Sequence, residues 1–140
     1  MDKEDLNELL AHASVENTTK LDLSNKDIYE LPAEIGKLVQ LKELNLSYNN
    51  LISLPPEIGQ LQKLETILLL RNDIVEIPEE IGNIASLRTI DISYNPIEKL
   101  PETIGKLSNL QTLDASYCKI TNLPLSFINL LSLKNLYLEN

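Results

Sequence analysis

The residue types that most often build catalytic, metal-binding or disulfide-linked sites are nearly missing from this sequence. It holds one cysteine, one histidine, one phenylalanine and no tryptophan. Cys118 alone allows no disulfide within the chain, and His12 cannot complete a zinc site with it or a nucleophile–histidine–acid triad. We therefore expect no cofactor, no metal site and no enzyme activity. With so few aromatic residues, the core has to be built from leucine and isoleucine.

Positive charge and long apolar runs are also scarce. The chain has 12 Lys and Arg against 21 Asp and Glu, a formal net charge of −9 at pH 7. Such a surface repels nucleic-acid phosphates and anionic membranes. The longest apolar run, Ile67–Leu70, is too short to span a bilayer, and Met1–Asp5 is too acidic for a signal peptide. We expect a cytoplasmic protein that binds neither nucleic acid nor membrane.

What the sequence does contain is an internal repeat of 23 residues. The rows align without insertion when they start at Leu21, Leu44, Ile67, Ile90 and Leu113, with a partial sixth row from Leu136. The twelfth position is proline in every full row: Pro32, Pro55, Pro78, Pro101 and Pro124. The sixteenth position holds all four glycines, with Ile128 in row five: Gly36, Gly59, Gly82 and Gly105. Residues 21–140 therefore form an array of five full rows and part of a sixth.

Each row is expected to contain a short strand followed by a turn. In row two, Leu44 and Leu46 flank a polar residue, so both point to one side of a strand. Strands from consecutive rows bury that side by stacking into a parallel sheet. The sixth position predicts a structural ladder of inward side chains that bond free backbone groups at the turn: Asn49, Asn72, Asn95 and Cys118. Cys118 is expected to be a buried, unreactive thiol.

The rest of each row reads Leu-Pro-x-Glu-Ile-Gly and predicts one short α or 3₁₀ turn. Proline suits the start of such a turn and glycine its end, and the helix dipole explains the glutamates without an acidic binding ridge. Residues 1–20 do not follow the repeat. They predict an amphipathic helix that caps the array, with Leu6, Leu9, Leu10 and Ala13 on one face and His12 as a surface or packing residue.

The pattern Leu41-x-x-Leu44-x-Leu46-x-x-Asn49-x-Leu51 resembles the conserved segment of leucine-rich repeats. The 23-residue length resembles the intracellular subclass, found in Ras-suppressor and Scribble-type proteins, plant intracellular Ras-group-related proteins, bacterial repeat proteins and Roco-type GTPases. The sequence departs from that pattern at Lys26, Ala115, Cys118 and Ile128. The resemblance implies an α/β fold: a right-handed solenoid with a concave parallel β-sheet that binds protein, and short helical turns on the convex side.

Residues between the leucine positions are expected on the concave face. The candidate partner-binding residues are Tyr48, Leu68, Leu70, Arg71, Asp91, Tyr94, Asp114 and Tyr117. Tyr and Arg at position five are types enriched in binding hot spots, although this position could merely tolerate tyrosine. Leu68 and Leu70 replace polar residues in the middle of the sheet and predict an exposed apolar patch that contacts a partner. The alternative is that they have no role in binding, because scattered surface leucines are common.

Asp91 and Asp114 are expected side by side on adjacent strands, about 5 Å apart. Two solvated carboxylates that point apart are the favoured interpretation. A bound cation, a partner's Lys or Arg, or a raised pKa is the alternative. A dedicated metal site would need more oxygen ligands than the neighbouring residues supply.

Together these features predict an interaction module that binds another protein on its concave face. Because the chain stops part-way into row six, at Asn140, we also consider a fragment of a longer array. In that case it would be the sensing or recruiting N-terminal region of a larger signalling enzyme, such as a GTPase, a kinase or a ubiquitin ligase. A third hypothesis is a scaffold that self-associates through an uncapped C-terminal end.

Overall fold

Six strands form one parallel sheet whose order follows the sequence. They are β1 (Lys20–Asp22), β2 (Glu43–Asn45), β3 (Thr66–Leu68), β4 (Thr89–Asp91), β5 (Thr112–Asp114) and β6 (Asn135–Tyr137). The computed structural model describes all 140 residues, and each strand pairs in a 23-residue register, as Leu44 does with Ile67. The predicted parallel sheet is confirmed. The strands begin one residue earlier than the Leu-x-Leu alternation indicates, at Glu43 instead of Leu44 in row two.

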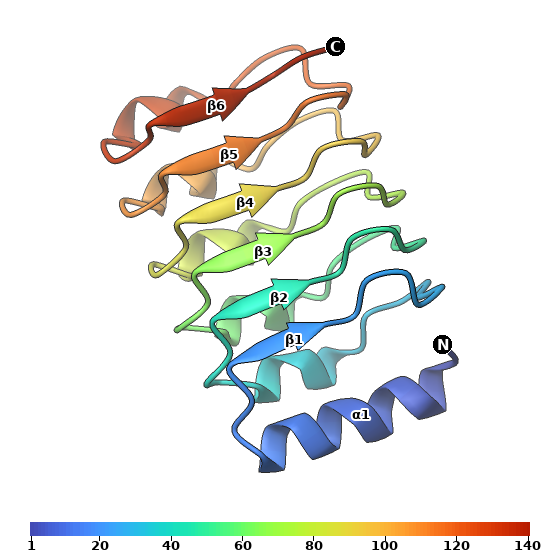
Figure 1. Cartoon of the computed structure of the whole chain (residues 1–140). Coiled ribbons are helices and arrows are strands. Elements are labelled where there is room, and N and C mark those ends of the chain that lie inside the picture. Colours follow the sequence, from blue (N-terminus) through green and yellow to red (C-terminus); the bar gives the residue numbers. More distant parts are fainter.

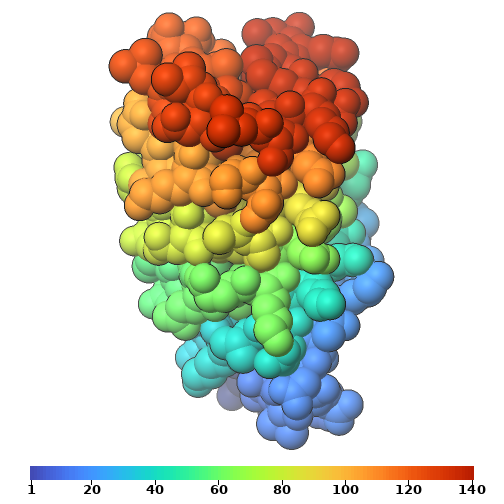
Figure 2. All heavy atoms as spheres, turned by 90° about the vertical axis from the view of Figure 1, so that its left-hand side faces the viewer, coloured from blue at the N-terminus to red at the C-terminus, as the bar shows by residue number.

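Five 3₁₀ helices return the chain from one strand to the next. They are η1 (Ala33–Lys37), η2 (Pro56–Gln60), η3 (Glu79–Asn83), η4 (Glu102–Lys106) and η5 (Leu125–Asn129). The repeated proline lies just before each helix in extended conformation, as at Pro32 with φ −72° and ψ 155°. Sheet and 3₁₀ helices lie on opposite sides of a right-handed solenoid (Figure 1), and the rows stack as successive bands along one column (Figure 2). The predicted α/β solenoid is confirmed.

The glycines have a different role from the one expected. No glycine has a positive φ, so none is a left-handed residue that ends a turn. Instead, each lies against the next row: a Cβ at Gly82 would be 2.5 Å from the carbonyl oxygen of Thr103 and 2.6 Å from its Cβ. A missing side chain therefore lets successive 3₁₀ helices pack closely. Ile128 at the same position of row five is exposed.

An α-helix precedes the first row. Helix α1 (Lys3–Val15) begins after Asp2, whose carboxylate accepts a hydrogen bond from the Asp5 N–H at 2.9 Å. Its buried residues Leu6, Leu10 and Ala13 join the core, with Leu9 partly buried beside them. The helix packs on η1, at the bottom of the column (Figure 1). It covers apolar side chains of row one that no earlier row covers.

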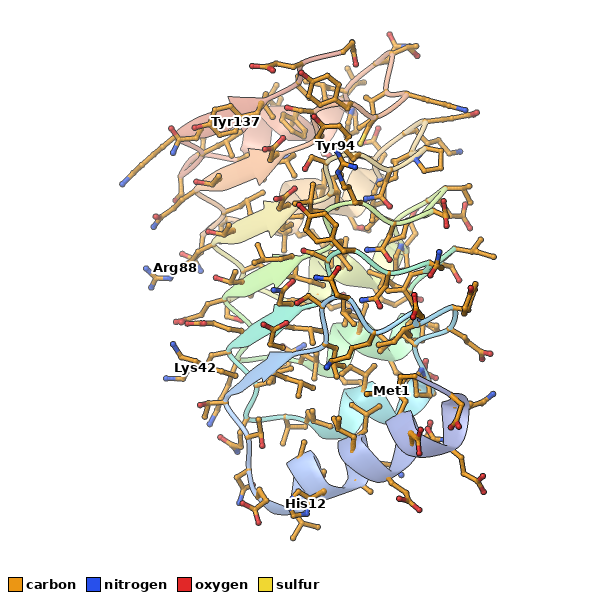
Figure 3. All side chains as sticks on the ribbon, turned by 45° about the vertical axis from the view of Figure 1, so that its right-hand side comes forward. Met1, His12, Lys42, Arg88, Tyr94 and Tyr137 are labelled. Carbon is orange, nitrogen blue, oxygen red and sulfur yellow. The ribbon has the colours of Figure 1, made fainter.

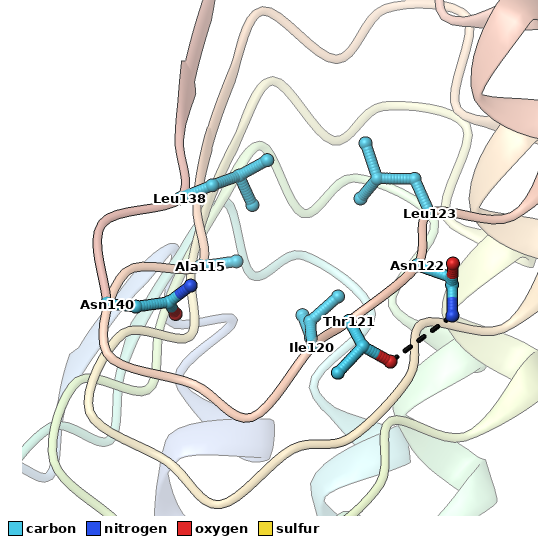
Figure 4. Close-up of a pocket in the computed structure, with 7 residues that line it drawn as sticks. All are labelled: Ala115, Ile120, Thr121, Asn122, Leu123, Leu138 and Asn140. Atoms are coloured by element: carbon cyan, nitrogen blue, oxygen red, sulfur yellow. Dashed lines mark hydrogen bonds between the residues drawn. The ribbon is translucent and has the colours of Figure 1, made fainter.

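One continuous core connects the helix with row five. It contains 34 buried residues, nearly all of them Leu or Ile, as the low aromatic content predicts. In row six, Leu136 and Leu138 are exposed, and a hollow of about 160 Å³ lies between rows five and six, with Ala115 in its wall (Figure 4). Ala115 replaces a Leu or Ile of the other rows, so the smaller side chain contributes to this hollow. None of the helices combines the length and the apolar content that a membrane span requires.

Candidate protein-binding surface

The side chains at position five share an unusual backbone conformation. Tyr48, Arg71, Tyr94 and Tyr117 have φ values of 58°, 54°, 55° and 55°. This left-handed region costs a residue with a side chain about 1–2 kcal/mol relative to right-handed backbone. Five consecutive rows turn off the sheet in this way, because Asn25 of row one has a φ of 54°. Position five is therefore a repeated structural feature that the residue types alone did not reveal.

Three of these side chains form a stack across rows three to five. The Arg71 Cζ atom lies 4.7 Å from the centroid of the Tyr94 ring. The Tyr94 and Tyr117 rings are stacked, with centroids 4.4 Å apart and an interplanar angle of 24°. The Tyr117 hydroxyl donates to a Glu139 carboxylate oxygen at 3.3 Å, and the neighbouring Tyr94 and Glu139 raise the pKa of Tyr117. Tyr48 is exposed and lies outside the stack.

The stack stands where the strands end. Figure 3 shows Tyr94 beyond the C-terminal ends of the strands, whereas Lys42 and Arg88 project from the opposite ends. Arg71 is free of any ion pair with an acidic side chain, although the chain is strongly acidic. Its guanidinium therefore makes a cation–π contact, and its N–H groups form no hydrogen bond with an acceptor of this chain.

The paired carboxylates on the sheet face have local hydrogen bonds that explain them. Asp91 accepts from the N–H and the hydroxyl of Ser93, at 2.9 and 2.6 Å. Asp114 accepts from the Ser116 N–H at 2.9 Å. Each aspartate thus closes a turn at the end of its own strand. Within the chain, no group of three or more His, Cys, Asp or Glu side chains is placed to hold a metal ion.

The same bond recurs in rows one and two. Asp22 accepts from the N–H of Ser24 at 2.9 Å, and Asn45 accepts from the N–H of Ser47 at 3.0 Å. The hydrogen bond from the Ser24 hydroxyl lowers the pKa of Asp22. An Asp or Asn at position two with Ser at position four is therefore the regular arrangement. This spacing is visible in the sequence and is the signal that could have identified the turn.

Row three departs from that arrangement. Leu68 and Leu70 take the places of the acceptor and the serine, and both are partly buried, so the apolar patch is less open than the sequence indicates. A shallow hollow of about 330 Å³ lies over the first three strands, and Leu68 lines it together with Asn45. Leu68 at the end of β3 and Leu70 just after it thus precede Arg71, where the stack begins, in the third of the six rows.

The asparagine column lies beneath this surface. Asn72 donates to the carbonyls of Leu46 and Leu69 at 3.0 and 3.1 Å and accepts from the Leu51 N–H at 3.0 Å. Asn49 and Asn95 make the corresponding bonds to their own rows and the preceding ones. The side chain of row n therefore holds the turn of row n−1 in place. Lys26 of row one takes part only through its backbone. Its N–H donates to the Asn49 side chain, and its carbonyl accepts from the N-terminal amine.

Cys118 occupies the ladder position of row five with fewer bonds. Its Sγ lies 3.3 Å from the Ile92 carbonyl oxygen, and burial raises the pKa of the thiol. We expect Cys118→Asn to raise the free energy of unfolding by about 1 kcal/mol, because the amide can also reach the Ala115 carbonyl and the Ile97 N–H. Chemical denaturation would measure this increase. Cys118→Ser, which cannot bridge both groups, is the control, and a lower stability of Cys118→Asn than of the unaltered chain would contradict the prediction.

These rows define the class of the protein: a solenoid repeat protein with one parallel sheet and one 3₁₀ helix per row. The family model of the leucine-rich repeat region matches residues 17–94 and 78–140. The chain therefore belongs to the leucine-rich repeat family. Regions of this family generally mediate protein–protein interaction and are typically non-catalytic.

Solved structures agree with this assignment. A leucine-rich-repeat protein of Leptospira interrogans, LIC12759, is 35% identical with a TM-score of 0.74, over 90% of this chain and 38% of that one. The plant peptide hormone receptor RGFR1, solved in complex with RGF2, is 36% identical with a TM-score of 0.75, over 84% of this chain and 20% of the receptor. The ectodomain of the receptor kinase SOBIR1 from Arabidopsis thaliana is 26% identical with a TM-score of 0.72, over 85% and 71%. No curated protein matches the sequence.

Proposed function

We propose that this chain is an interaction module that binds a partner protein on its sheet face, centred on Leu68, Leu70 and the stack of Arg71, Tyr94 and Tyr117. The observation that carries the proposal is the stack itself, because its arginine has no acidic partner, contacts one of two stacked tyrosines and follows two partly buried leucines in row three. Binding hot spots are enriched in Tyr and Arg. A similar plant receptor was solved with a partner, RGF2, which supports the same role here.

The test compares the unaltered chain with a triple variant, Leu68→Ala/Arg71→Ala/Tyr94→Ala. Partner recovery in affinity capture is expected to fall at least about tenfold, because losing hot-spot contacts costs about 2 kcal/mol or more. Circular dichroism is expected to be unchanged. The matched control is Glu34→Ala/Lys37→Ala/Val39→Ala, three exposed residues in and just after η1. Equal recovery by both triple variants would refute binding on the sheet face.

A second proposed function is that of a sensing or recruiting region within a larger signalling protein. It is supported by the chain spanning only 38% of the Leptospira protein and 20% of the plant receptor. A reading frame that continues into a kinase, GTPase or ubiquitin-ligase domain would support it, and a stop codon directly after Asn140 would reject it.

We also propose self-association through the C-terminal end of the array, supported by exposed apolar side chains in row five, at Leu125, Ile128 and Leu131, and in β6. Light scattering would detect the dimer, and a monomer at all concentrations would reject it.

We also propose that the protein belongs to the intracellular subclass and is cytoplasmic. The 23-residue register supports the subclass, and the free, buried Cys118 supports the location. Fractionation of cells that express the tagged chain would test the location.

A further inference from the structure

One backbone donor in the middle of the sheet face lacks the acceptor that its counterparts have. In rows one, two, four and five, the N–H at position four donates to a side-chain oxygen at position two, at 2.9 to 3.0 Å. In row three the donor is the Leu70 N–H and position two is Leu68, which has no acceptor. The Leu70 N–H makes no hydrogen bond within the chain. Row six also lacks the Asp or Asn acceptor and the serine, because Tyr137 and Glu139 occupy positions two and four. Its position five is Asn140 and not an arginine.

The four regular rows show what fits at this donor. In three of them the acceptor is an aspartate carboxylate, and in row two it is the Asn45 amide oxygen. The chain therefore demonstrates repeatedly that a side-chain oxygen can approach this N–H to within about 3 Å. In row three the chain supplies no such oxygen, so an acceptor for the Leu70 N–H has to come from outside the chain.

Arg71 indicates which oxygen would be favoured. It follows Leu70 directly, its guanidinium lies 4.7 Å from the Tyr94 ring, and it forms no ion pair with this chain. A carboxylate bonded to the Leu70 N–H would be attracted by the unpaired positive charge of the following residue, Arg71, and a neutral amide would not. Asp91 is the register partner of Leu68, and its negative charge repels an incoming anion. Its Oδ1, however, already accepts two hydrogen bonds from Ser93.

We propose that the Leu70 N–H and the Arg71 guanidinium receive an acidic side chain of an extended segment of a partner protein, and that an apolar neighbour of that side chain packs on Leu68. The incoming carboxylate takes the place that Asp22, Asp91 and Asp114 fill in their own rows. The apolar neighbour packs on Leu68 at the edge of the shallow hollow of about 330 Å³, whose lining is otherwise mostly polar. This inference rests on the proposed function, because it names the partner chemistry of the same face.

The experiment titrates isotope-labelled protein with a blocked Leu-Asp-Leu tripeptide and follows the backbone amide resonances by NMR. A saturable shift of the Leu70 amide is expected, with at least about tenfold weaker binding of the Leu-Asn-Leu and Leu-Lys-Leu peptides. Equal responses to the three peptides, or no saturable shift of Leu70, would overturn the inference.

Two variants test the mechanism. Leu68→Asn supplies an internal acceptor to the Leu70 N–H, so it is expected to weaken binding of the acidic peptide at least tenfold while the chain stays folded. Asp91→Asn retains the bond to Ser93 and removes the opposing charge, so tighter binding is expected. Weaker binding by Asp91→Asn would indicate a basic occupant and overturn the inference.

Val75→Asn is the matched control for Leu68→Asn. It places an asparagine at an exposed apolar position of row three, outside the hollow, and leaves the Leu70 N–H without an acceptor, so the Leu70 response should be unchanged. In affinity capture, loss of the partner with the triple variant but not with Leu68→Asn would leave the proposed function standing and refute this inference alone.

Discussion

Asn72→Ala is expected to lower the free energy of unfolding by about 3–5 kcal/mol, a large part of the stability of a domain of this size. Asn72 is buried and makes three hydrogen bonds to backbone groups, the carbonyls of Leu46 and Leu69 and the Leu51 N–H. Alanine leaves these groups without partners, and an unpaired buried polar group costs about 1–3 kcal/mol. Equilibrium denaturation with urea measures the loss.

The neighbouring residue supplies the control for Asn72. Asp73 is exposed, so Asp73→Ala is expected to change stability by less than about 0.5 kcal/mol. Asn72→Asp keeps the shape but places a carboxylate against the Leu46 and Leu69 carbonyl oxygens, and it should be at least as destabilising as alanine. A loss below about 1 kcal/mol for Asn72→Ala would show that the asparagine ladder does not hold the rows together.

Gly82→Ala is expected to destabilise the chain by about 2–3 kcal/mol. The new Cβ would lie 2.5 Å from the Thr103 carbonyl oxygen and 2.6 Å from the Thr103 Cβ, so η3 and η4 have to move apart. Elsewhere, where the backbone is compatible, replacing glycine by alanine usually stabilises a protein by about 0.4–1 kcal/mol through the unfolded state. The clash reverses that sign. The shift of the thermal unfolding midpoint measures it.

Asn83→Ala, at the next and exposed position, is the control for Gly82→Ala and should leave the unfolding midpoint nearly unchanged. The glycines also allow an internal comparison. At Gly36 the shortest contact, 2.6 Å, is to the Gln60 side chain, which can turn away, and the nearest backbone atom lies at 2.9 Å. Gly36→Ala is therefore the milder substitution. A stabilising Gly82→Ala would show that the rows are not closely packed on this side.

The parts of the fold that could be predicted are those in which one residue type has one role. Leu44, Ile67 and Leu113 repeat at one spacing because only apolar side chains fit an inward position, and all three are buried. The repeat alone therefore gives the register and the sheet. The first strand residue, Glu43, could not be located from the pattern, because it faces outward and hydrogen bonding alone makes it part of β2.

The sequence shows which residues of the candidate surface lie between the leucine positions, but it does not show their geometry. Tyr94 and Arg71 could be placed on the sheet side by counting from the leucines. Their left-handed backbone could not be foreseen, because neither type favours it and glycine, which does, was absent there. The stack was equally hidden, because Tyr48 has the same left-handed backbone and yet lies outside it. The free Leu70 N–H could not be predicted either, because the Asp or Asn acceptor that it lacks is defined by the hydrogen bonds of the other rows.

The strained backbone under the stack has a consequence for how tightly a partner can be held. Arg and Tyr side chains normally lose rotational freedom on association, about 0.5–1.5 kcal/mol for each one immobilised. Here Arg71, Tyr94 and Tyr117 restrict one another by contact, at 4.7 and 4.4 Å, before any partner arrives. Much of that entropy is lost during folding, together with the left-handed strain. The surface is therefore preorganised, and a small contact area can yield more affinity than the same residues would give on a mobile loop.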